Sequence, residues 1–129
     1  MDARLREGIT RFEQGRYLEA QRIFEELRHE TEGSDREFYQ GWALLAAALF
    51  HRDRGNRTGA QRCFDRARAH WSAVGQEYGG LRLDELLRGV EEALGRDWAQ
   101  VRFDPDRTGL AELDRRLGRR GVGPGAPTR

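Results

Sequence analysis

The chain has 129 residues, of which 37% are hydrophobic and 35% charged, and its formal net charge is +1. This length fits one domain that buries a core without metals, and the single cysteine, Cys63, excludes an internal disulfide. No apolar run approaches the roughly 20 residues of a membrane span, and the charge-rich start is unlike a signal peptide, so we expect a cytoplasmic protein with no membrane contact.

The first two predicted helices cover residues 3–14 and about 17–30, where apolar side chains recur at helical spacing. These side chains are Leu5, Ile9 and Phe12 in the first segment, and Tyr17, Ala20, Phe24 and Leu27 in the second. The short connection through Gly15 predicts that the two helices form an antiparallel hairpin.

A third helix is predicted from Ser34, because Ser34 and Glu37 have the spacing of a capping box. It is apolar on most sides through Phe50, as expected of a central helix, and should end near Gly55. Asn56 is predicted to cap the fourth helix. The apolar residues of that helix are Ala60, Cys63, Phe64, Ala67, Trp71 and Val74.

Gly75 and the pair Gly79 and Gly80 predict a loop, followed by a fifth helix that Gly95 closes. The apolar side chains of this helix are Leu83, Leu86, Leu87, Val90 and Leu94. Beyond it we expect an extended segment near 96–108 and a short sixth helix containing Leu110, Leu113 and Leu117. The predicted domain organisation is one helical domain, residues 1–118, and a flexible Gly/Pro/Arg-rich tail, residues 119–129.

Two segments forty residues apart repeat one pattern: residues 15–24 read GRYLEAQRIF and residues 55–64 read GNRTGAQRCF. A fixed period of this kind is typical of stacked helix pairs. The first copy resembles the turn and second helix of a tetratricopeptide repeat, although the period of that repeat is 34 residues. We therefore predict an all-α, compact bundle of five to six helices, built from two tetratricopeptide-like antiparallel hairpins plus a C-terminal helix.

A broader resemblance covers roughly residues 5–95. Its motif residues are Phe12, Gly15, Tyr17, Glu19, Ala20, Glu25, Gln40, Gly41, Ala46, Ala47, Ala48, His51, Gly55, Asn56, Gly59 and Ala60. In this order they are similar to the bacterial and archaeal family called domain of unknown function 309. The family's pattern has His, Glu, Trp and Gln at four positions that are Gln21, Arg22, Arg28 and Leu44 here. The resemblance implies a small all-helical fold and brings no established activity.

The absence of a catalytic pattern favours a non-catalytic module that binds a protein or peptide partner, or a second copy of itself. The alternative is a small-ligand binder or enzyme with a polar pocket around Gln40 and His51. On the family resemblance, Glu19, Glu25, Gln40 and His51 are the candidate binding residues. His51 is also explained as a side chain that stabilises the end of its helix.

Three other signals are interpreted structurally. Glu26 and His29 have the spacing of a di-iron ligand pair, but no second pair exists, so neither a metal nor a cofactor is predicted. Cys63 is expected to be a small buried apolar side chain. The arginine-rich stretch 52–68 could contact nucleic-acid phosphates, but no aromatic residues alternate with its arginines, so this alternative is the weakest.

Overall fold

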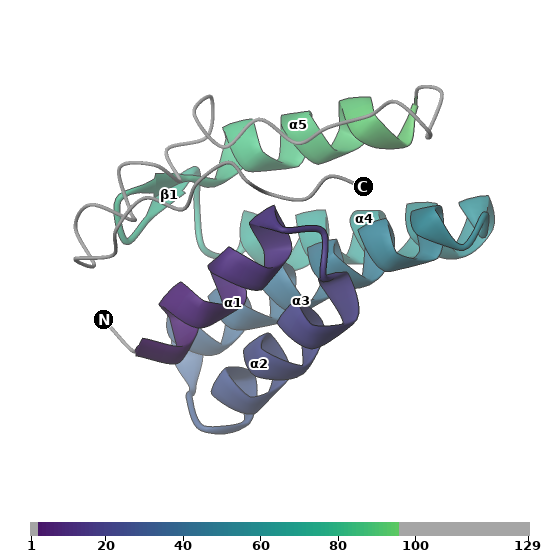
Figure 1. Cartoon of the computed structure of the whole chain (residues 1–129). Coiled ribbons are helices and arrows are strands. Elements are labelled where there is room, and N and C mark those ends of the chain that lie inside the picture. The colour runs from purple at the N-terminus through teal and green to yellow at the C-terminus, as the bar shows by residue number, and fades with distance from the viewer. Residues whose placement is uncertain (1–2, 96–129) are drawn as a thin grey trace.

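Apolar residues recur at helical spacing along most of the chain. The computed structural model describes residues 3–95, and this part of the chain contains five α-helices (Figure 1). They are α1 (Ala3–Glu13), α2 (Tyr17–His29), α3 (Gly33–Asp53), α4 (Arg57–Ser72) and α5 (Leu83–Leu94). Two short strands, β1 (Glu77–Tyr78) and β2 (Leu81–Arg82), lie between α4 and α5. The all-α prediction is confirmed, and the five predicted helices within this part of the chain end within three residues of their expected positions.

Both predicted hairpins form, and each turn depends on a glycine. Gly15 has a φ of 80° between α1 and α2, and Gly55 has a φ of 77° between α3 and α4. Only glycine adopts this left-handed conformation at little cost. Ala20 and Ala60, which follow these turns, are both buried, as the repeat predicted.

The predicted capping box at the start of α3 is wrong. The helix begins at Gly33, and Glu32 is the capping residue, with no side-chain cap hydrogen bond. Gly33 has a φ of 64°, so the backbone itself reverses direction there and a serine cap is not required. Glu37 reaches instead across to α4, where it contacts His70.

The loop before α5 is more regular than predicted, because it contains an antiparallel hairpin of β1 and β2. Glu77 pairs with Arg82, and Tyr78 pairs with Leu81. Gly79 and Gly80 both have positive φ, which is the conformation that a two-residue hairpin turn requires. Leu81 is fully buried, so the hairpin is joined to the core.

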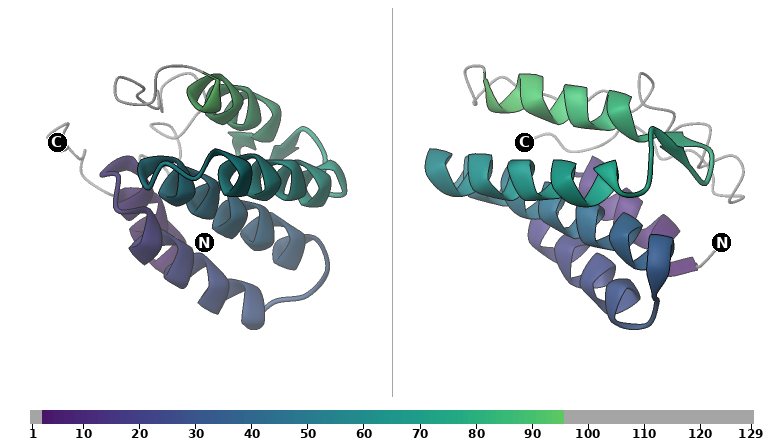
Figure 2. Two further views of the ribbon diagram at one scale, coloured as in Figure 1. Left: turned by 90° about the vertical axis from the view of Figure 1, so that its right-hand side faces the viewer. Right: turned by 180° about the vertical axis from the view of Figure 1, so that it is seen from behind.

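α3 lies at the centre of the described fold. It packs against α2 on one side and α4 on the other, while α1 packs on α2 and α5 packs on α4. Seen from behind, α4, α3 and α2 follow one another, and α1 lies on their far side (Figure 2, right). The helices therefore form a layer of α2, α3 and α4, with α1 on one face of that layer.

Trp42 of α3 is the centre of an aromatic core. Its ring stacks on Phe24 at 5.1 Å between centroids and meets the edges of Phe12 at 5.2 Å and Trp71 at 5.7 Å. These side chains come from α1, α2 and α4, so one residue joins both hairpins. Aromatic pairs in such geometry add to the stabilisation from burial alone.

The expected extended segment, sixth helix and tail lie outside the described residues, and the division at residue 118 stays a prediction. No helix between residues 3 and 95 is long and apolar enough to cross a membrane.

Candidate functional site

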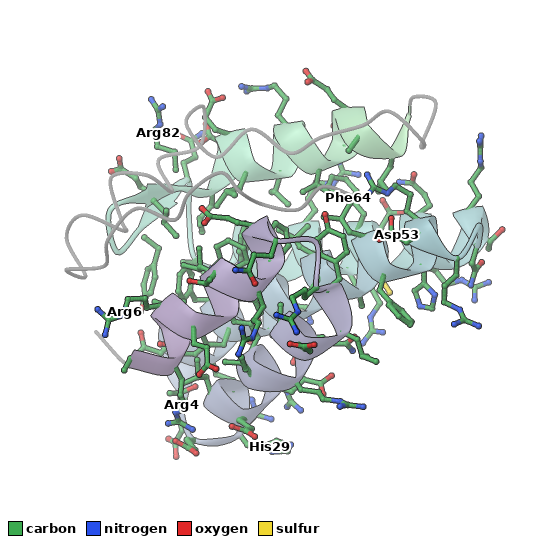
Figure 3. The ribbon with its side chains drawn as sticks, in the orientation of Figure 1. Arg4, Arg6, His29, Asp53, Phe64 and Arg82 are labelled. Carbon is green, nitrogen blue, oxygen red and sulfur yellow. The ribbon has the colours of Figure 1, made fainter. Side chains whose placement is uncertain are left out.

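Glu19 lies on the side of α2 that faces α1. Its carboxylate is 3.3 Å from Arg11 Nε of α1 and 3.3 Å from the guanidinium of Arg16. These ion pairs, together with that of Arg4 and Glu30, join the exposed surfaces of α1 and α2. Figure 3 shows Arg4 and His29 at the same end of the hairpin.

Glu25 points in another direction from the same helix. Gln21 Nε2 donates a hydrogen bond of 3.1 Å to Glu25 Oε2 one turn along α2. The helical rotation of about 100° per residue separates Glu25 from Glu19 by roughly 120° around the helix. The two glutamates therefore do not share one site.

Gln40 and His51 lie on the same side of α3, but far apart along it. Eleven residues of helix separate them by about 16 Å, which is well beyond hydrogen-bond reach. The structure therefore does not bring the four predicted binding residues into one cluster. It places Gln40 and His51 on a common face of α3, and it places Glu19 beside Arg11 of α1.

That face of α3 carries five residues at a spacing of three and four, which we call the α3 stripe. Its members are Glu37, Gln40, Leu44, Ala47 and His51. Glu37, Gln40 and His51 are half-buried, and Leu44 and Ala47 are nearly covered. Leu44 belongs to the hydrophobic core, whereas Ala47 is buried but lies outside it.

Both ends of the α3 stripe form a polar contact, one with α4 and the other with Asn56, the residue that caps α4. At one end, Glu37 Oε1 lies 2.6 Å from His70 Nδ1. At the other end, His51 Nδ1 lies 3.3 Å from Asn56 Nδ2. We call the line between these two contacts the α3–α4 seam.

Leu44 and Cys63 lie at the same level, near the middle of the seam. Leu44 is two helical turns after Glu37, and Cys63 is two turns before His70, so antiparallel packing brings them to the same level. Burial raises the pKa of the Cys63 thiol, and Arg66 partly opposes this shift. Cys63 is half-buried, less covered than the apolar pattern predicted, and its raised pKa leaves it a poor nucleophile.

Hydrogen bonding fixes the orientation of the side chains at the His51 end. Asn56 Oδ1 accepts a bond of 2.9 Å from the backbone N–H of Gly59, as the predicted helix cap should. The Asn56 amide nitrogen is therefore turned toward His51 and donates to its Nδ1. This pattern assigns the His51 hydrogen to Nε2. A Cβ at position 59 would lie 2.5 Å from Asn56 Nδ2, so glycine leaves room for the cap.

Two exposed arginines lie beside the seam on α4. Arg62 and Arg66 are one helical turn apart, and neither forms a hydrogen bond or ion pair among the described residues. α4 carries four arginines and one aspartate, which makes this helix strongly basic. The two side chains thus leave positive charge available at the surface.

The other arginines of the predicted basic stretch are engaged elsewhere. Arg52 is buried and contacts Asp53 at 2.9 Å, and the Arg54 guanidinium lies 5.6 Å from the Phe50 ring centroid. Arg68 contacts Asp65 at 3.3 Å and Glu91 of α5 at 3.8 Å. The stretch 52–68 is therefore not one continuous cationic surface.

Glu26 and His29 each contact an arginine. Glu26 lies 3.8 Å from Arg4 of α1, and His29 Nε2 lies 3.3 Å from Arg28. Within residues 3–95, no group of three or more His, Cys, Asp or Glu side chains is arranged to hold a metal ion.

Two polar pairs escaped the sequence reasoning because their members are distant along the chain. Glu37 and His70 are 33 residues apart, and the Tyr78 hydroxyl donates to Asp35 Oδ1 across 43 residues. The hydrogen bond to Asp35 raises the pKa of Tyr78 to about 12. No local motif signals either pair.

A comparison with protein families finds a match over residues 5–63 to the model described as Domain of unknown function (DUF309). This segment is similar to the domain of unknown function 309 family, as the sequence resemblance predicts. It runs from α1 to the middle of α4 and ends at Cys63 of the α3–α4 seam. No curated protein and no solved structure matches the chain.

The structure explains several residues that carried the likeness to the domain of unknown function 309 family. Gly55 makes the turn, Asn56 caps α4, and Gly59 makes room for that cap. Gln40 has no such structural partner among the described residues, which makes it the strongest candidate for binding within the family segment.

Proposed function

We propose that this protein is a non-catalytic module that binds a protein or peptide segment along the α3–α4 seam. The observation that supports this function is the elongated line of half-buried polar side chains along the seam. Glu37, Gln40 and His51 follow one another on α3, and polar pairs lie at both ends of this line. The ends, at Glu37 and His51, are fourteen residues or about 21 Å apart, which is the length of a four-turn helix or a six-residue strand.

Peptide recognition commonly uses such an elongated surface, because a partner helix or strand contacts it at regular intervals. A small-molecule site needs polar groups that converge on one point. Gln40 and His51 do not converge, since about 16 Å of helix lies between them. The geometry therefore favours a peptide or protein partner over the alternative of a ligand pocket around these two residues.

Nucleic-acid binding has less support. Phosphate recognition relies on several free cations along one surface. Arg52 and Arg68 are held by carboxylates, which leaves few arginines of the stretch 52–68 for such contacts.

The proposal includes a tetratricopeptide-like character for the two hairpins and a cytoplasmic location. The matched positions of Ala20 and Ala60, each buried after its glycine turn, support the first. The second rests on composition, because the chain carries one cysteine and abundant charge.

Site-directed photo-crosslinking tests the function. A photoreactive amino acid replaces Gln40 on the seam in one variant and Arg22 in the matched control, which is exposed on α2. In living cells that produce the protein, we expect discrete crosslinked protein adducts from position 40 and not from position 22. Equal adducts from both positions, or none from position 40, would contradict the proposal.

A further inference from the structure

We draw no further inference here: the strongest candidate, the cluster of half-buried polar side chains Gln21, Glu25 and Arg28 along one side of α2, carries nothing, because Gln21 and Glu25 bond to each other within the helix and nothing in residues 3–95 shows what covers this side.

Discussion

The indole Nε1 of Trp71 donates a hydrogen bond of 2.9 Å to the backbone carbonyl of Phe38. This bond joins the last turn of α4 to the first turns of α3, and it exists because Gly41 has no side chain. A Cβ at position 41 would overlap the Trp71 indole. A helix-breaking residue thus occupies the central helix because it lets an aromatic ring lie directly on the backbone.

Gly41→Ala is expected to destabilise the fold by about 1–3 kcal/mol, because the new methyl group overpacks a closed contact. The effect opposes the gain of about 1 kcal/mol that alanine usually brings to a helix. Thermal or urea unfolding measures the loss. In the background of Trp71→Leu the same substitution should cost much less, and an equal cost in both backgrounds would show that the overlap is not the cause.

Local signals in the sequence account for most of the described fold. Glycines at the turns, the Asn56 cap and the apolar spacing of each helix all act within a few residues, so periodicity reveals them. The prediction for the start of α3 is wrong, because Ser34 and Glu37 have capping spacing but Glu37 contacts His70 instead. A local pattern cannot show that a distant residue competes for the same side chain.

The candidate site was harder to predict for the same reason. Gln40 and His51 were correctly expected on the central helix, but helical rise separates them by about 16 Å. Glu19 was expected to join them, whereas the arginines of the first hairpin hold it near α1. The seam depends on how α3 and α4 are aligned along each other. Two contacts show this alignment: Glu37 with His70, and His51 with Asn56.

Asn56→Ala should cost about 1 kcal/mol of stability, because the backbone N–H of Gly59 loses its acceptor. Asn56→Asp keeps an acceptor oxygen and should cost less, which makes it the matched control.

His51→Gln should change stability by less than about 1 kcal/mol, since glutamine still reaches polar groups at the end of α3. Chemical denaturation compares the three variants. A loss with Asp as large as that with Ala would argue against the capping role.

Phe24→Ala and Phe64→Ala should each destabilise the protein by about 3–5 kcal/mol, as large truncations in closed cores do. Both rings are fully buried, Phe24 against Trp42 and Phe64 within the second hairpin. Leu18→Ala is the control, because Leu18 is 39% exposed and should lose less than about 0.5 kcal/mol. Similar melting temperatures for all three variants would contradict the predicted equivalence of the repeated phenylalanines.

Tyr78 should titrate later than an ordinary tyrosine, because its hydroxyl donates to Asp35, which raises the pKa of Tyr78 to about 12. A pKa raised above the usual value near 10 means that the fold favours the neutral phenol. The stabilisation is therefore complete below about pH 10 and is lost as the pH rises from about 10 to 12. Absorbance at the tyrosinate band, measured for wild type, Asp35→Asn and Tyr78→Phe, isolates this residue from the other two tyrosines. Asp35→Asn should lower the pKa of Tyr78 and weaken the loss of stability at high pH. If its titration curve matches that of the wild type, the bond between β1 and the start of α3 does not form in solution.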